Sequence, residues 1–159
     1  MKNIVIWGLG SHAIKNIIPA IVSSNDLNLF GICTRNLKIL EEHATKFNCL
    51  KFESEESMLE DGDIDIVFLS TPIGLHVAHG MKVLESGKHL WCEKPLTSEM
   101  TDTQKLISFS RKKQLMVAEG FMYLHHPHFN AVKSFIYDQL QNGIISINIK
   151  FGIPFLEKP

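Results

Sequence analysis

The fold is decided by the stretch Asn3-Ile-Val-Ile-Trp-Gly-Leu-Gly-Ser-His-Ala13. It begins with a short apolar run, as expected of a buried strand, and the pattern G-x-G-x-x-A follows at once. In such a turn Gly8 permits the tight bend, Gly10 lets a phosphate approach the backbone, and Ala13 allows the helix to pack closely on the strand. The first N–H groups of that helix offer partial positive charge to an anion. The stretch therefore predicts a phosphate-binding turn between a strand and a helix.

Outward from this turn, short apolar runs alternate with helical stretches. The predicted strands cover residues 3–7, 27–33, 50–52, 64–69, 89–92 and 115–118, and the predicted helices cover 11–22, 37–47, 54–59, 75–86, 98–113 and 127–140. Such interleaving indicates βαβ units and a parallel sheet. We therefore predict an α/β Rossmann fold, a doubly wound parallel sheet with helices on both faces. Pro19 is expected to kink the first helix.

The last stretch differs from the rest. Residues 145–151 alternate with period two, which is typical of a half-buried strand. We interpret it as the first strand of a truncated second domain, so that residues 1–122 form a dinucleotide-binding domain and residues 123–159 a connecting helix and stub. Because an orphan strand exposes an unpaired edge, a second copy or a separate chain is expected to pair with it.

Composition sets broad limits. A chain of 159 residues with a net charge of −1 suits a globular domain, and nothing in it points to nucleic acid or a membrane surface. The three cysteines have no metal-ligand spacing, which favours reduced thiols and a cytoplasmic location. His125, His126 and His128 look like a metal cluster, but Pro127 interrupts them and no acid or cysteine completes a site. We predict no metal.

The end of the second predicted strand indicates which dinucleotide binds. An acidic residue usually binds the ribose hydroxyls of NAD there, whereas this chain has Thr34 and Arg35. A guanidinium suits the 2′-phosphate of NADP through paired, charge-assisted hydrogen bonds, and the Thr34 hydroxyl adds a donor. The pattern favours NADP, with NAD as the alternative. Arg35 could instead be a surface residue that caps the next helix.

Two further loops follow predicted strands. Ser70-Thr71-Pro72 comes after the fourth strand and Glu93-Lys94-Pro95 after the fifth. Ligands of open α/β sheets bind at the carboxyl edge, so these loops and the glycine turn should meet at one crevice. From the first turn of the glycine helix, Ser11 and His12 also face that crevice, although His12 could equally point into solvent.

These pieces resemble the Gfo/Idh/MocA family, named after glucose–fructose oxidoreductase and inositol dehydrogenase. The resemblance runs along essentially the whole chain, and Glu-Lys-Pro is its most specific sign. The matching pieces are Gly8–Ala13, Thr71-Pro72 with His76, Glu93–Pro95, and Glu119–Tyr123 followed by His126-Pro127. Leu124 departs from the pattern, because the family frequently has arginine there.

The resemblance implies roles for these residues. Lys94 would be the catalytic residue, buried beside the nicotinamide, where it orients the reacting oxygen and helps to move its proton. Glu93 would position Lys94 or bind the nicotinamide ribose, and Pro95 would follow a cis peptide bond. The remaining members of the implied cofactor site are Thr71, Pro72, His76 and Glu119. Without the resemblance, Glu93 and Lys94 would be a surface pair, and His76 would cap or pack on its own helix.

Two functions remain open. Family members continue into a second domain that carries the sugar-binding pocket, and this chain ends after its expected first strand. We therefore expect a cofactor domain of an oxidoreductase that transfers a hydride to or from a sugar or polyol, inactive unless the second domain is supplied. The alternative is a non-catalytic dinucleotide-binding module or a truncated gene product.

Overall fold

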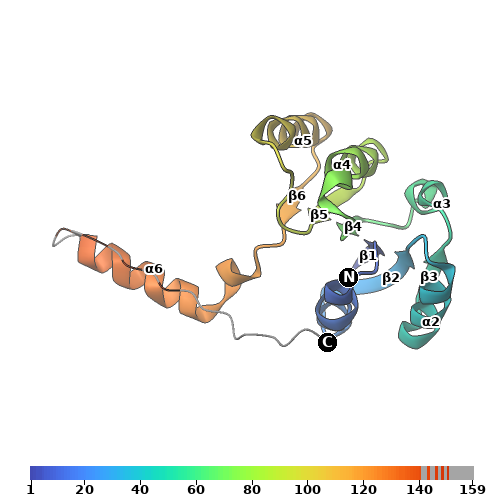
Figure 1. Ribbon diagram of the computed structural model, residues 1–159, viewed down its shortest axis with the longest axis horizontal. Helices are drawn as coiled ribbons and strands as arrows, with labels where there is room; N and C mark the ends of the chain where they lie inside the picture. Colours follow the sequence, from blue (N-terminus) through green and yellow to red (C-terminus); the bar gives the residue numbers. More distant parts are fainter. Residues whose placement is uncertain (141–142, 144–145, 147, 149, 151–159) are drawn as a thin grey trace. The chain divides into compact units, whose positions relative to one another are not determined.

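A computed structural model describes residues 1–140, 143, 146, 148 and 150 of the chain (Figure 1). Its contacts separate one compact unit, Met1–Phe121, from a second unit, Met122–Pro159. The predicted strand over residues 145–151 falls largely outside the described residues, so it stays a prediction. The domain limits drawn from the sequence, 1–122 and 123–159, stay predictions as well.

The first unit is built on one six-stranded sheet. Its strands are β1 (Lys2–Trp7), β2 (Leu27–Cys33), β3 (Leu50–Phe52), β4 (Ile66–Leu69), β5 (His89–Cys92) and β6 (Val117–Glu119). They lie in the order β3-β2-β1-β4-β5-β6, and every neighbouring pair is parallel. This is the doubly wound order of a Rossmann sheet, which confirms the predicted fold class. All six carboxyl ends therefore lie along one edge.

Helices connect the strands (Figure 1). In the first unit they are η1 (Ala13–Ile17), α1 (Ile18–Val22), α2 (Leu37–Phe47), α3 (Glu55–Glu60), η2 (Ile73–Leu75), α4 (His76–Glu85) and α5 (Met100–Lys113). Side chains cap two of them: Asn36 accepts from the N–H of Ile39 at the start of α2, and Ser54 accepts from the N–H of Ser57 at the start of α3. These caps satisfy N–H groups that have no partner within the helix.

Two sequence expectations need comment. The helix is irregular where a kink was expected at Pro19: the turn before it widens into the π-helix η1, in which the N–H of Ile18 donates to the carbonyl of Ala13, because proline lacks an N–H and crowds the preceding turn. The sixth strand begins at Val117 rather than at residue 115, because the N–H of Leu115 is used to close α5 on the carbonyl of Ser110.

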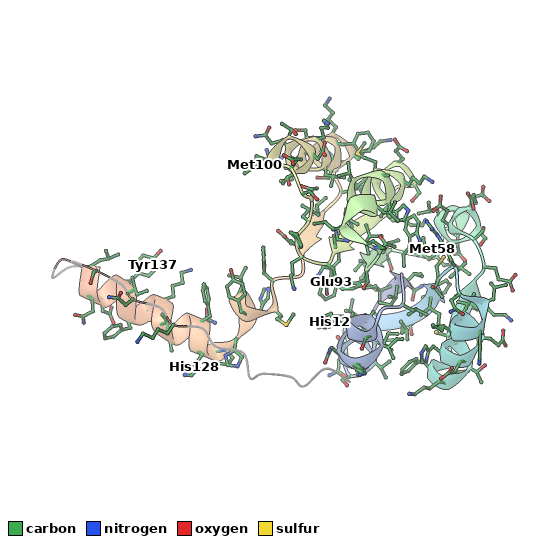
Figure 2. The ribbon with its side chains drawn as sticks, viewed as in Figure 1. His12, Met58, Glu93, Met100, His128 and Tyr137 are labelled. Carbon is green, nitrogen blue, oxygen red and sulfur yellow. The ribbon has the colours of Figure 1, made fainter. Side chains whose placement is uncertain are left out.

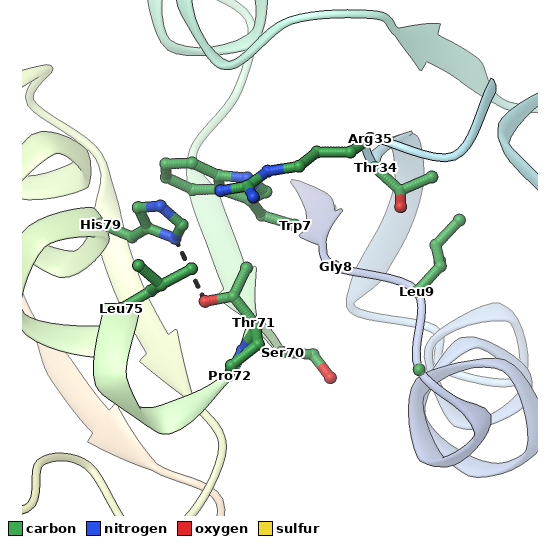
Figure 3. Close-up of a pocket in the computed structure, with 11 residues that line it drawn as sticks. Trp7, Gly8, Leu9, Thr34, Arg35, Ser70, Thr71, Pro72, Leu75 and His79 are labelled. Atoms are coloured by element: carbon green, nitrogen blue, oxygen red, sulfur yellow. Dashed lines mark hydrogen bonds between the residues drawn. The ribbon is translucent and has the colours of Figure 1, made fainter.

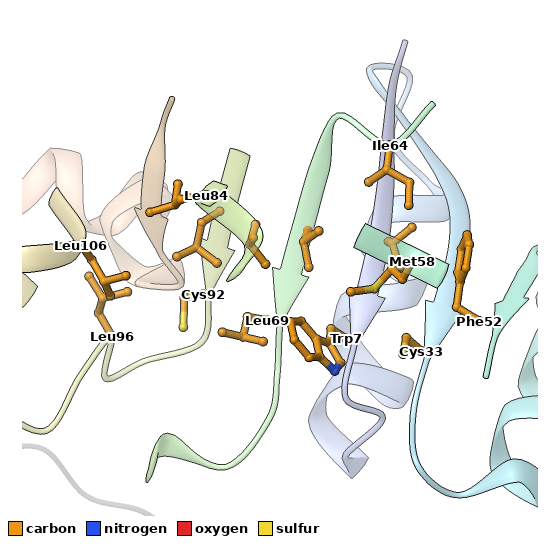
Figure 4. Packing of buried hydrophobic residues seen from close by; sticks show 14 residues of the cluster. Trp7, Cys33, Phe52, Met58, Ile64, Leu69, Leu84, Cys92, Leu96 and Leu106 are labelled. Atoms are coloured by element: carbon orange, nitrogen blue, oxygen red, sulfur yellow. The ribbon is translucent and has the colours of Figure 1, made fainter. Parts of the chain in front are cut away.

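The sheet carries a hydrophobic core on each face. On one face α3, α4 and α5 contribute Met58, Val83, Leu84 and Leu106, all fully buried (Figure 4). On the other face η1, α1 and α2 cover a second cluster, whose fully buried members include Ile4, Ile6, Ile18 and Phe68. The two cores hold β1 and β4 rigidly at the centre of the sheet. The strands are therefore a firm support for the loops at their carboxyl ends.

The second unit holds η3 (Met122–His125) and α6 (Pro127–Leu140). Tyr123 and Phe129 meet edge to face within it, with ring centroids 5.5 Å apart. Tyr137 on α6 is one of the exposed aromatic side chains of that helix, whereas Met58 is fully buried in the first unit; Figure 2 labels both residues. No helix within the described part of the chain has the length and apolar character needed to cross a membrane.

Candidate functional site

A cleft opens at the carboxyl ends of β1, β2 and β4 (Figure 3). Its volume is about 480 Å³, which lies in the range of small-molecule sites. Eleven residues from three strand ends and from the start of α4 line it: Trp7, Gly8, Leu9, Gly10, Thr34, Arg35, Ser70, Thr71, Pro72, Leu75 and His79. The glycine turn and the loop after β4 therefore converge as predicted, whereas the loop Glu93–Pro95 after β5 does not line this cleft.

The two glycines of the turn serve different purposes. Gly8 has φ +98°, and its N–H donates to the carbonyl of Cys33 at 2.9 Å. A Cβ at Gly8 would lie 2.6 Å from the carbonyl oxygen of Ser70, so only glycine lets β1 and β4 end this close together. A Cβ at Gly10 would meet nothing within 4 Å. The fold therefore requires glycine at position 8, whereas position 10 faces open space where a ligand can approach.

An aromatic pair forms one wall of the cleft. The rings of Trp7 and His79 stack with centroids 4.1 Å apart and an interplanar angle of 16°. His79 Nδ1 lies 3.1 Å from the Thr71 hydroxyl, which ties the ring to the loop after β4 (Figure 3). Burial lowers the pKa of His79. The positive charges of Lys82 and Arg35 lower this pKa as well, whereas the carboxylate of Glu55 raises it. The sequence pattern did not indicate this pair; the position of Trp7 directly before the phosphate turn could at most have marked the tryptophan as a cleft residue.

Arg35 extends from the end of β2 across the cleft toward Trp7 (Figure 3). Its side chain is exposed, and no hydrogen bond or ion pair to Arg35 occurs among the described residues. The alternative that Arg35 caps the next helix is wrong, because Asn36 is the N-cap of α2. Thr34 stands beside it, and its hydroxyl lies 3.5 Å from the N–H of Asn36. An unpaired guanidinium is thus held at the mouth of the cleft.

His76 joins two loops instead of lining the cleft. It is 2% exposed, and its Nε2 lies 2.8 Å from the carbonyl of Thr71. Its Nδ1 lies 3.0 Å from the carbonyl of Pro95 and 3.2 Å from that of Leu96. The imidazole therefore connects the loop after β4 to the loop after β5. This is a structural role of the kind the sequence left open, and a direct contact of His76 with a ligand stays a prediction.

The loop after β5 presents Lys94 to solvent. Lys94 is exposed, so the burial expected around its ammonium group is not supplied by the described residues. The Lys94–Pro95 peptide bond is cis, as the resemblance implied. Glu119, at the end of β6, accepts from the N–H of Leu96 at 2.8 Å and so fixes the far side of the loop. Glu119 is therefore an anchor of the lysine loop, and its predicted place beside a nicotinamide is not tested.

The glycine helix touches that loop through His12. His12 Nε2 lies 3.3 Å from Glu93 Oε1, and the two side chains are 40% and 14% exposed. Ser11 is exposed in the first turn, whereas Ala13 is fully buried, as its predicted packing role requires. The turn after β1 and the loop after β5 therefore meet at one point of the carboxyl edge. His12 faces this junction, and its contact with a phosphate stays a prediction.

The cysteine thiols at this edge are buried. Burial raises the pKa of Cys33 to about 11 and that of Cys92 to about 12, and nearby glutamates act in the same direction. Because the thiolate is the reactive form, both cysteines remain protonated near neutral pH. Cys92 instead packs against His76, with Sγ 3.3 Å from Nδ1.

Comparison with known proteins gives a consistent picture. The model of an oxidoreductase family with an NAD-binding Rossmann fold, GFO_IDH_MocA, matches residues 2–121. The dTDP-3,4-didehydro-2,6-dideoxy-alpha-D-glucose 3-reductase of Saccharopolyspora spinosa is 32% identical over 153 residues, which cover 94% of this chain and 45% of the relative. The D-xylose 1-dehydrogenase (NADP(+)) 2 of Haloferax volcanii is 26% identical over 152 residues, 94% of this chain and 46% of the relative.

Solved structures agree. KijD10, a 3-ketoreductase from Actinomadura kijaniata in complex with TDP-benzene and NADP, superposes with a TM-score of 0.80 at 27% identity. The match covers 91% of this chain and 44% of KijD10. The chain thus spans a little under half the length of the relatives it matches.

The two glycines allow a matched test of the turn. We expect Gly8→Ala to lower the free energy of unfolding by at least about 2 kcal/mol, because a Cβ there has an unfavourable φ and clashes with the Ser70 carbonyl. Gly10→Ala should stay within about 0.5 kcal/mol of the natural chain, because its Cβ enters open space. Urea unfolding followed by circular dichroism measures both. Equal losses in the two variants would contradict the account of the turn.

The buried imidazole of His79 makes stability depend on pH. Because the pKa of His79 is lowered in the folded chain, the unfolded chain takes up a proton first as the pH falls. The free energy of unfolding should therefore decrease from about pH 7.5 to about pH 5.5. His79→Phe, which can still stack on Trp7, should reduce this decrease, whereas His125→Phe, at an exposed position of the second unit, should not. Identical pH profiles in all three chains would rule out the assignment.

Proposed function

The chain belongs to the Gfo/Idh/MocA oxidoreductase family, and on this premise we propose that it binds NADP(H) for hydride transfer to or from a sugar or polyol. The observation that carries the proposal is the unpaired guanidinium of Arg35 at the mouth of the cleft formed around Gly8 and Gly10. Relatives whose names include NADP or a sugar substrate support it.

The residues present suit such a cofactor. The open space at Gly10 and the helix beginning at residue 11 would receive the pyrophosphate, with Ser11 and His12 in the first turn. The apolar side chains of Leu9 and Leu75 line the cleft together with Trp7 and would accept the adenine ring.

The choice of NADP over NAD rests on charge. Arg35 offers paired donors to a 2′-phosphate, and Thr34 adds a hydroxyl. Three glutamates, Glu53, Glu55 and Glu56, share a neighbouring hollow with Arg35. Of these, Glu55 forms an ion pair with Lys82 and lies 3.9 Å from His79 Nε2, so part of that negative charge is already balanced. A phosphate at Arg35 would therefore draw its attraction from the guanidinium itself, against the charges of Glu53 and Glu56.

The lysine loop would supply the proton chemistry. When bound, the nicotinamide gives or accepts the hydride. In the reducing direction Lys94 would hold the carbonyl oxygen of the substrate and give it a proton, so that a hydroxyl group results. In the oxidising direction Lys94 would take that proton. Glu93 and Glu119 would hold the loop in place, because Glu93 accepts from the N–H of Lys94 and Glu119 accepts from the N–H of Leu96.

The substrate half is a separate part of the proposal. Residues 123–159 would lead into a substrate domain, and the relatives named as dTDP-sugar reductases suggest a keto-sugar as the substrate. We also propose a cytoplasmic location, which the three free cysteines favour. We further propose that a second copy of this chain, or a separate chain, pairs with residues 145–151.

Calorimetric titration of the purified chain with NADPH and with NADH tests the cofactor proposal. We expect NADPH to bind more tightly, and Arg35→Ala to weaken NADPH binding by about 10- to 100-fold, because a charge-assisted contact is worth about 1.5–3 kcal/mol. NADH binding should change little. Arg111→Ala removes the same charge from the last turn of α5 and should leave both affinities unchanged.

Each other outcome has a definite meaning. Tighter binding of NADH would overturn the role of Arg35 and leave the dinucleotide site in place. Failure of both dinucleotides to bind would contradict cofactor binding by this chain on its own. Binding without turnover after a second domain is supplied would favour the non-catalytic module.

A further inference from the structure

A line of polar groups connects the phosphate turn to the lysine loop. Asn16 Nδ2 lies 3.0 Å from His12 Nδ1, and His12 Nε2 lies 3.3 Å from Glu93 Oε1. The other carboxylate oxygen, Oε2, accepts from the N–H of Lys94 at 3.2 Å. Figure 2 labels His12 and Glu93 on the two facing elements. His12 is thus the only member of this line that belongs to the turn and also touches the loop.

The contact between the two side chains is shielded from water but incomplete. His12 Nε2 and Glu93 Oε1 are both inaccessible to solvent, and neither makes a hydrogen bond to any described residue. A shielded carboxylate oxygen beside an imidazole is unfavourable unless the facing nitrogen carries a proton. A proton on Nε2 would lie between these two atoms in both charge states of the ring.

Asn16 can serve both of those states. Toward a neutral ring its amide N–H donates to Nδ1, as the assigned orientation has it. Toward an imidazolium the amide turns over, and its oxygen accepts from Nδ1–H. The surroundings of His12 therefore accommodate a second proton without any rearrangement of the backbone.

The charges around His12 come from both elements. Glu93 faces it from the loop after β5, and Lys94 is adjacent there. Lys15 lies one turn along the same helix and is exposed. Glu119 sits behind the loop, with its carboxylate committed to the N–H of Leu96. A pyrophosphate at Gly10 would bind two residues before His12 in the chain and would add negative charge near the imidazole.

We propose that His12 takes up a proton from solvent when a dinucleotide binds at the turn, and that the resulting imidazolium holds Glu93 and the lysine loop against the bound phosphates. The proposal rests on the proposed cofactor site and adds to it a positioning residue. Imidazole is the side chain suited to this task, because it changes charge near neutral pH. Dinucleotide binding should accordingly become tighter as the pH falls.

Calorimetry measures the proton directly. NADP⁺ is titrated at one neutral pH into the chain in MOPS and again in imidazole buffer, and the difference in heat gives the number of protons taken up. We expect uptake by the natural chain, together with an affinity about tenfold higher near pH 6 than near pH 8. His12→Gln keeps an N–H donor toward Glu93 but cannot titrate. It should bind NADP⁺ with less proton uptake and a flatter pH profile.

The comparison is internally controlled. The 2′-phosphate of NADP⁺ and every other imidazole are the same in both chains, so the difference between them belongs to residue 12. His125→Gln, on the second unit, should behave like the natural chain. Glu93→Gln removes the carboxylate without touching His12, and it should also reduce the uptake. This second variant keeps the test decisive if His12→Gln does not fold.

The outcomes separate the two proposals. Equal proton uptake by the natural chain and by both variants, with NADP⁺ bound in each, would overturn the role of His12 and leave the cofactor site intact. Failure of the natural chain to bind NADP⁺ would overturn the cofactor site itself, and the role of His12 with it. Circular dichroism of each variant establishes that the fold is kept.

Discussion

The arrangement depends on one close approach, that of Gly8 to the carbonyl of Ser70. A single added carbon at Gly8 would lie 2.6 Å from that oxygen, so the ends of β1 and β4 can meet only because the turn has no side chain there. Since all six strands are parallel, this point fixes the centre of one edge to which every following loop is attached. The cleft exists because β1 and β4 diverge into separate loops directly after this contact.

The loops are held to one another by side chains as well as by the sheet. His76 connects the loop after β4 to the loop after β5, and Glu119 connects the latter to β6. His12 adds a contact from the glycine helix to Glu93. The loops of the carboxyl edge are therefore joined to one another by side-chain contacts. A residue such as His76 can then matter for a site that it does not line.

Much of the site followed from local sequence. The glycine turn, the loop Thr71-Pro72 and the Arg35 position each follow a strong strand directly, so strand prediction was enough to place them at one edge. Contacts that join distant segments did not follow. Nothing in the local pattern of Trp7 or His79 shows that the two rings stack, because the two residues lie 72 positions apart in the sequence and only the folded sheet brings them together.

The sequence by itself determined the order of strands and helices, the parallel sheet and the phosphate turn. The physical reason is that apolar periodicity and glycine conformation act over a few residues. Only the tertiary structure decided which face each polar side chain presents. It turned His12 toward Glu93, committed His76 and Glu119 to holding loops, and left Arg35 unpaired and Lys94 in solvent. These assignments depend on burial and distance between segments far apart in the chain, which no local pattern encodes.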